Sequence, residues 1–225
     1  MSDHPVGHRQ VVLGSASPAR RGLLRAAGIE PVVRVSGINE EALVADLVSG
    51  STEADAPRPP ALALQLARAK AADVARSVTS DPDLGTAIVI GCDSILEWQG
   101  QAFGKPESAS EAVGRWRAMR STMGLLHTGH CVIDLATDTE SSEVVTTQVW
   151  FGELTDSEID SYVDTGEPLA VAGAFTLDGI GSAFVDRIVG DPSNVIGLSI
   201  PWLRRVIAGF GIPWPQLWRR TDPTA

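Results

Sequence analysis

One carboxylate and two lysines are the residues of this chain whose types could act together on a phosphorylated small molecule. Asp93 follows the apolar run 87–90 in the segment 91–94, and α/β proteins place reactive groups at the carboxyl ends of strands. Lys70 interrupts an apolar row of a predicted helix, and Lys105 lies in a Gly-Lys-Pro turn. A carboxylate or a metal-bound hydroxide can activate water, while cations neutralise a departing phosphate group. These residues predict hydrolysis at a phosphorus atom close to Asp93.

Each of these residues also has a structural interpretation, and the sequence leaves both open. An aspartate that follows a strand often caps a turn or a helix. The stem of Lys70 can cover the core while its ammonium reaches water, or the ammonium can point into a cleft. Cys92 could act as a nucleophile beside Asp93, but a free cysteine is more often a small buried thiol, and we expect that role here.

A second candidate feature is the loop 14–17, which lies between an apolar run and a predicted helix. Ser17 is the natural N-cap of that helix, so free backbone N–H groups point to whatever lies before it. A phosphate at this place would meet the positive end of the helix dipole. Arg20 and Arg21 lie in the first turn, where the dipole disfavours cations. A bound anion would explain them, and two solvated surface arginines are the alternative.

Further carboxylates come from Glu40 and Glu41, in an acidic stretch of the chain. Together with Asp93 they could hold Mg²⁺ beside a triphosphate, because this ion accepts carboxylate and phosphate oxygens as ligands. His127 and His130 do not predict a zinc pair. They lie in a strand-like run, where side chains three residues apart face opposite sides.

Strand-like runs and helical patterns must position these residues. The predicted strands are 11–13, 31–35, 87–92, 126–135, 143–151 and 183–189, and residues 95–98 are expected to continue extended up to a turn at 99–100. The predicted helices begin at Pro18, after 57–60 and at Asp191, and cover 41–47, 109–119 and 156–165. The fourth and fifth strands form a hairpin, because only a short polar stretch separates them.

The last third of the chain carries clear boundary signals. Thr155 and Glu158 form a capping box that opens the fifth helix. Asp191 is the N-cap of a single last helix, and from about residue 212 a tail with two prolines is expected to be loosely held. No internal repeat or linker divides the sequence, so we expect one domain over residues 1–225.

The composition limits the possible partners. With a formal net charge of −10 and no long basic run, the chain is not expected to bind duplex nucleic acid or an anionic membrane. Its two cysteines lie far apart without a CxxC pair, which argues against a disulfide framework or a thiolate zinc site. The sequence has no GxxxxGK[ST] loop, no apolar signal core and no membrane-length apolar run. We therefore expect a cytoplasmic protein that is not a P-loop NTPase.

Ten short motifs together resemble those of the Maf family of nucleoside triphosphate pyrophosphatases. They are the segments 13–21, 23–24, 36–40, 69–71, 91–94, 104–106, 128–129, 166–168, 172–175 and 191–198. They recur in the family's order from about residue 11 to 204, which is nearly the whole chain.

The resemblance implies an α/β fold of the inosine triphosphatase-like type, with an elongated mixed sheet, two lobes and a central cleft. It also implies metal-dependent hydrolysis of a nucleoside triphosphate to the monophosphate and pyrophosphate, with Mg²⁺ or Mn²⁺. Asp93 matches the family's proposed proton acceptor and, with Glu40, a position that holds the metal. The other matching positions line the cleft and handle phosphates. They are Ser15, Arg20, Lys70 and Lys105. Ser17, the expected N-cap in the same motif, is a further candidate for substrate binding.

Three positions depart from the branches of the family whose base preference is known. Ala19, Ser94 and Asp178 match neither the branch that acts on dTTP and UTP nor the branch that acts on 7-methyl-GTP. The carboxylate of Asp178 can accept hydrogen bonds from guanine and favours a cationic methylated base, whereas Ala19 has no aromatic surface for stacking. Gly124 and Val171 also stand where relatives carry His and Lys. The resemblance therefore leaves the base open.

The main alternative function is a nucleotide-binding regulator of septum formation without significant turnover, since the family is also associated with that role. A homodimer is plausible from the general frequency of such assemblies. Release of pyrophosphate from nucleotides would distinguish the enzyme from the regulator.

Overall fold

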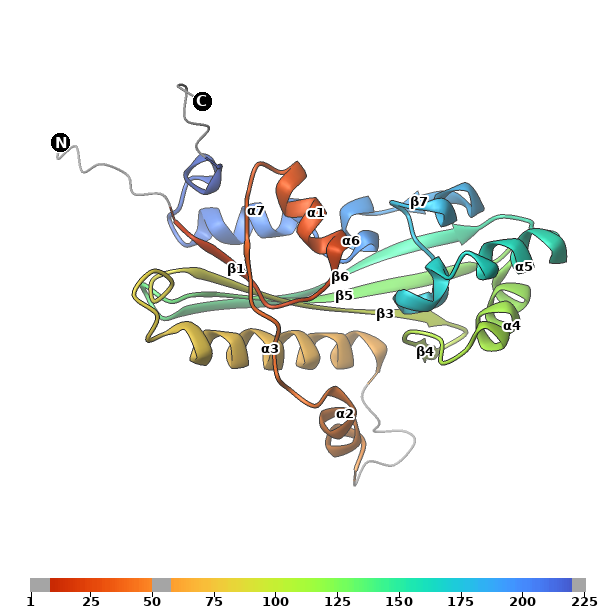
Figure 1. Cartoon of the computed structure of the whole chain (residues 1–225), viewed down its shortest axis with the longest axis horizontal. Helices are drawn as coiled ribbons and strands as arrows, with labels where there is room; N and C mark the ends of the chain where they lie inside the picture. Colours follow the sequence, from red (N-terminus) through yellow and green to blue (C-terminus); the bar gives the residue numbers. More distant parts are fainter. Residues whose placement is uncertain (1–8, 50–57, 220–225) are drawn as a thin grey trace.

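One mixed sheet of seven strands runs through the part of the molecule that the computed structural model describes, residues 9–49 and 58–219 (Figure 1). The strands are β1 Val11–Leu13, β2 Val32–Val33, β3 Ile88–Trp98, β4 Gln101–Phe103, β5 Met123–Asp134, β6 Thr139–Phe151 and β7 Val185–Val189. Their order is β2-β1-β3-β5-β6-β7, and β4 pairs with β3 at its far end. β1 is parallel to β2 and β3, and all other pairs are antiparallel.

Helices cover both faces of this sheet. In Figure 1, α3 lies along one face, α1, α6 and α7 lie on the other, and α4 and α5 lie near the far end of the long strands. The α-helices are α1 Pro18–Ala26, α2 Glu40–Val48, α3 Pro59–Val78, α4 Ala109–Met119, α5 Asp156–Asp164, α6 Pro192–Ile196 and α7 Ile200–Gly209. Short 3₁₀ turns cover Glu167–Ala170, Ala172–Ala174, Ile180–Phe184 and Trp214–Leu217. The predicted α/β class with a mixed sheet is confirmed. No described helix is long and apolar enough to span a bilayer.

The alternation of side chains along β3 divides the core between the two faces. Ile88, Ile90 and Cys92 pack with α1 and α7, while Val89 packs with α3. Further along the strand, Leu96 belongs to a separate aromatic-rich cluster with α4 and α5. Because successive residues of a strand face opposite sides, any two neighbouring side chains of β3 pack against different helix layers.

Two glycines let α3 lie directly on the sheet. A Cβ atom on Gly91 would collide with the backbone of Ala67, and one on Gly129 would collide with the backbone of Ala63. Gly91 and Gly129 lie on the adjacent strands β3 and β5, so the helix approaches both closely. Asp93 lies two residues after Gly91 and therefore on the same face of β3. The close packing of α3 brings Lys70 over this residue.

Asp93 lies in the middle of a strand, so the prediction that a strand over 87–92 ends before it is wrong. The expected extended continuation over 95–98 is confirmed as the second part of β3. β3 continues to Trp98 because β5 pairs with it from Ile88 to Glu97, a non-local contact that the local sequence does not reveal. The parallel ladder with β1 does end close by, at the pair Leu13 and Ile90. Asp93 therefore lies just beyond the point where the parallel ladder with β1 ends, while its own strand continues.

The predicted hairpin of β5 and β6 and the capping box of α5 are confirmed. The prediction of a single last helix is wrong. Gly197, with a φ of 120°, ends α6, and Ser199 caps a separate α7. The loosely held tail is also wrong as far as the described residues reach. Leu217 is buried in the core, and the backbone N–H of Arg219 donates to Gly28. Residues 220–225 of that tail lie outside the described residues.

Candidate active site

The ammonium of Lys70 joins two carboxylates from different parts of the chain. Its Nζ lies 2.5 Å from Oδ1 of Asp93 and 2.9 Å from Oε1 of Glu40. The side chains of Lys70 and Asp93 are 11% and 14% exposed, while that of Glu40 is 53% exposed. The sequence left open whether Lys70 reaches water or a cleft, and the structure places its ammonium among these carboxylates.

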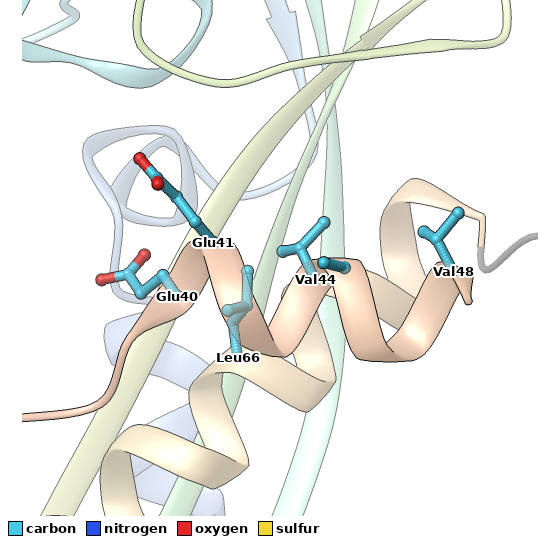
Figure 2. Close-up of a pocket in the computed structure, with 6 residues that line it drawn as sticks. Glu40, Glu41, Val44, Val48 and Leu66 are labelled. Atoms are coloured by element: carbon cyan, nitrogen blue, oxygen red, sulfur yellow. The ribbon is translucent and has the colours of Figure 1, made fainter.

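Glu40 reaches this cluster from the first turn of α2. Asn39 caps that helix, its side chain accepting a hydrogen bond from Ala42 N at 2.9 Å. The loop before it is tied to α3, because Gly37 N donates to Oδ2 of Asp73 at 2.8 Å. A pocket of about 500 Å³ adjoins Glu40 between α2 and α3, with an apolar lining that includes Val44, Val48 and Leu66 (Figure 2). Glu40 thus marks the point where the ion cluster opens to solvent.

Burial raises the pKa of Asp93 above the usual range of an aspartate, and nearby Glu40 adds to this. The positive charges of Lys70 and Arg20 act in the opposite direction without cancelling the effect. A carboxylate with a raised pKa binds a proton more readily, which suits a group that must take a proton from water. The Cys92 thiol is fully buried, and burial raises its pKa to about 11, so the expectation of an inert buried thiol is confirmed.

The donor set fits a divalent cation only if the substrate completes it. Within the described ranges, no group of three or more His, Cys, Asp and Glu side chains could hold a metal ion. Mg²⁺, however, usually takes only one or two protein carboxylates, and substrate phosphates and water supply the remaining oxygens. Glu40 and Asp93 already converge on one cation, the Lys70 ammonium, and so meet that requirement.

The two histidines are separated as expected. His127 lies 2.9 Å from Oε2 of Glu97, whereas His130 accepts a hydrogen bond from Ser199 N at 2.9 Å on the opposite face. Burial lowers the pKa of His130 to about 3, so its imidazole is neutral.

The loop before α1 has the predicted cap. Oγ of Ser17 accepts a hydrogen bond from Arg20 N at 3.4 Å, and Oγ of Ser15 accepts one from Ser17 N at 3.2 Å. Gly14 N donates to the carbonyl of Ile90 at 2.8 Å, which places the loop beside β3. Arg21 instead pairs at the surface with Glu30, so the surface interpretation holds for that arginine.

Arg20 contacts protein groups rather than the space before the helix. Its guanidinium donates to Ser15 Oγ, to the carbonyls of Cys92 and Gly197, and to Ser94 Oγ, at 2.8 to 3.1 Å. Ser94 Oγ is also 2.9 Å from Thr128 Oγ1. The candidate residues Arg20 and Ser94 therefore meet each other on the face of β3 opposite Asp93.

The remaining candidate residues belong neither to the Asp93 cluster nor to the contacts of Arg20. Lys105 is exposed after β4, in a turn held by hydrogen bonds that the Gly104 carbonyl accepts from Gly173 and Arg115. Asp178 is exposed in a loop, and Ala19 is half-buried on α1. Over residues 9–49 and 58–219, the structure records no hydrogen bond or ion pair that joins Lys105 or Asp178 to the Asp93 cluster.

A family model described as Maf-like protein matches residues 10–210. The chain belongs to this family. A nucleoside triphosphate pyrophosphatase of Streptomyces coelicolor is 52% identical over 95% of this chain and 97% of the relative. Proteins with the same name from Salinispora tropica and Thermosynechococcus vestitus are 48% and 46% identical, over 96% and 89% of this chain and 91% and 93% of their own. The family resemblance read from the motifs is confirmed.

No role was assigned from the sequence to one half-buried carboxylate of this Maf-like chain, Glu167. It accepts hydrogen bonds from Tyr162 Oη at 3.0 Å, Thr176 Oγ1 at 2.5 Å, and the backbone N–H groups of Ile180 and Gly181 at 3.0 and 2.9 Å. Burial pushes the pKa of Glu167 upward, but these hydrogen bonds outweigh burial and lower it. Glu167 thus holds both ends of the loop that carries Asp178. Its partners lie up to 14 residues away in sequence, so only its place in a Gly-Glu-Pro motif marks it.

Proposed function

We propose that this chain hydrolyses nucleoside triphosphates to the nucleoside monophosphate and pyrophosphate. The observation that carries the proposal is the buried Asp93 carboxylate, which has a raised pKa and lies 2.5 Å from the Lys70 ammonium. The shared name of relatives that are about half identical to this chain supports the same reaction.

The proposed step is attack of water at the α-phosphorus. Asp93 takes a proton from the attacking water, and the new bond forms between the water oxygen and phosphorus. The bond from the α-phosphorus to the oxygen that bridges the α and β phosphates breaks, and this oxygen leaves with pyrophosphate. The Lys70 ammonium, already beside Asp93, stabilises negative charge that develops in the transition state.

Phosphate binding is assigned to the loop before α1 and to the β4 turn. Ser15 and Ser17 lie at the N-terminal end of α1, where the helix dipole favours an anion. The exposed ammonium of Lys105 adds a cation to this set. In an acidic protein, a few such local contacts and a metal ion are needed to offset repulsion of a triphosphate.

The cofactor of the proposed reaction is a divalent cation, Mg²⁺ or Mn²⁺, which Glu40 and Asp93 would hold together with the phosphates of the substrate. When bound, it neutralises phosphate charge and assists deprotonation of water. Because Lys70 contacts both carboxylates, the cation and the ammonium share the same partners.

The preferred base is proposed to be of the guanine type. Asp178 is exposed in its loop and can accept hydrogen bonds from guanine N1–H and the 2-amino group. Ala19 offers no ring for stacking, so recognition depends on this carboxylate rather than on an aromatic platform.

Pyrophosphate release from a panel of NTPs and dNTPs, with Mg²⁺ or Mn²⁺, tests the reaction. We expect release with at least one nucleotide well above the metal-only blank, and none after removal of metal by a chelator. If no nucleotide in the panel gives release above the blank, the enzyme is excluded in favour of a nucleotide-binding regulator.

A further inference from the structure

Arg20 ties together three segments that are distant in sequence. Its Nε donates to the carbonyl of Gly197 at 2.8 Å, at the end of α6. Its Nη1 donates to Ser15 Oγ at 3.0 Å and to the carbonyl of Cys92 at 2.9 Å, and its Nη2 donates to Ser94 Oγ at 3.1 Å. A guanidinium has five N–H donors, and four are directed at these protein acceptors. A bidentate phosphate contact needs two parallel donors, which Arg20 does not have left.

The contact with Cys92 continues the sheet beyond the end of β1. Gly14 N donates a hydrogen bond to the carbonyl of Ile90, and alternate carbonyls of a strand point to the same side. The next carbonyl on that side is that of Cys92, where β1 has already ended and β4 pairs only from Leu96 onward. Arg20 therefore replaces a missing strand neighbour at this point of β3.

The contact with Ser94 starts a hydrogen-bond chain whose direction is fixed. Arg20 can only donate, and the chain ends on the carbonyl of Asn194, which can only accept. Thr128 donates to that carbonyl at 2.9 Å, so Ser94 must donate to Thr128, at 2.9 Å, and accept from Arg20. Asn194 is itself fully buried and donates to Thr147 Oγ1 and two carbonyls. The chain thus ends on a buried residue whose side chain is hydrogen-bonded to β5 and β6.

Cys92 and Ser94 are the residues on either side of Asp93. We propose that Arg20 is a positioning residue, which holds β3 on both sides of Asp93 from the opposite face of the sheet and does not bind the triphosphate. This inference rests on the proposed pyrophosphatase function. Arg20 is therefore expected to affect kcat and to leave the affinity for phosphate groups unchanged.

The test compares kcat with the inhibition constant for pyrophosphate, the product that carries two of the phosphates. For Arg20→Gln we expect kcat to fall at least about tenfold, while the inhibition constant stays within about threefold of the wild type. Arg20→Lys should recover part of kcat, because an ammonium can donate to one or two of the same acceptors. Arg21→Gln, the matched change in the next residue, should leave both constants unchanged. A rise of tenfold or more in the inhibition constant of Arg20→Gln, or an unchanged kcat, overturns the proposal.

A second variant covers the case in which Arg20→Gln does not fold. Thr128→Val breaks the chain at a fully buried position and leaves every cation in place. We expect kcat to fall at least about threefold with the inhibition constant unchanged. An unchanged kcat in a folded Thr128→Val protein contradicts the positioning role.

Hydrogen exchange separates this inference from the proposed function. Exchange of backbone amides in peptides that cover residues 91–95 should become at least about tenfold faster in Arg20→Gln and unchanged in Arg21→Gln. This readout does not need turnover. If the wild type releases no pyrophosphate but exchange responds as expected, the function is wrong and the positioning stands. Unchanged exchange refutes the positioning even in an active enzyme.

Discussion

The two faces of β3 are built from adjacent residues but differ in how fully their polar groups are paired. On the α3 face, Asp93, Lys70 and Glu40 form a charged cluster in which one ammonium serves two carboxylates and one carboxylate is half-exposed. On the other face, Ser94 belongs to a chain of hydrogen bonds that runs from Arg20 to a buried carbonyl. The first arrangement can exchange its partners for those of a substrate. The second holds the strand still while this happens.

The largest effect should follow from removing the proton acceptor on the charged face. For Asp93→Asn we expect turnover to fall at least about a thousandfold, while nucleotide affinity stays within about tenfold, or roughly 1.4 kcal/mol. The amide keeps the size of the side chain but does not take a proton from water. Turnover in the pyrophosphate assay and binding by calorimetry measure the two effects, with the exposed Asp164→Asn as a control. Full activity of Asp93→Asn would remove this residue from the mechanism.

The stability of the charged face depends on its single cation. Lys70→Met leaves the Asp93 carboxylate buried and unpaired, and we expect a loss of about 3 kcal/mol in the free energy of unfolding. The double variant with Asp93→Asn should recover more than half of this loss, because it also removes the buried charge. Urea unfolding measures both, with the exposed Lys105→Met as a control. Equal stability of Lys70→Met and the wild type would show that the ion pair is not held in solution.

The two faces should respond to acid with opposite signs. Burial raises the pKa of Asp93 in the folded state, so its proton uptake stabilises the fold as the pH falls through that raised pKa. Burial lowers the pKa of His130 from 6.5 to about 3, so the unfolded state binds the proton first. The stability linked to His130 is present above pH 6.5 and is lost as the pH falls from 6.5 toward 3.

Unfolding free energies across this pH window test the contrast. In His130→Asn the unfolding free energy should fall less steeply on acidification than in the wild type. The difference in slope should correspond to at most one bound proton. In Asp93→Asn the fall should be steeper, because a group that resists acid denaturation is gone. If the two variants change the pH slope in the same direction, the assignment of opposite roles is wrong.

The smallest expected effect concerns the preference for a base, which is assigned to Asp178 in a loop outside β3. Asp178→Gln should lower kcat/KM for guanine nucleotides several-fold relative to other bases, about 1 kcal/mol of discrimination, without abolishing turnover. Glu167→Gln should produce a similar but weaker change, because it loosens the loop that carries Asp178. An unchanged order of substrates in Asp178→Gln would exclude this carboxylate from base recognition.

Local signals in the sequence predicted the parts of the site that depend on neighbouring residues. The Ser17 cap, the Lys70 interruption of a helical row and the short helix expected over 41–47 all follow from spacing within one element. The continuity of β3 through Asp93 could not be predicted, because it depends on pairing with β5 some 34 residues away at Ser94 and Thr128. The partners of Arg20 lie 5 to 177 residues away, so its local pattern indicated an anion site instead of a clamp. The break at Gly197 and the docking of Leu217 are likewise decided by tertiary contacts.

The central claim is that water attacks the α-phosphorus beside Asp93, and an isotope experiment tests it most directly. The wild-type protein is incubated with its preferred nucleotide and metal in H₂¹⁸O, and the products are analysed by mass spectrometry. We predict that one ¹⁸O atom appears in the nucleoside monophosphate and that pyrophosphate is unlabelled. Label in pyrophosphate, or release of orthophosphate, would contradict the account.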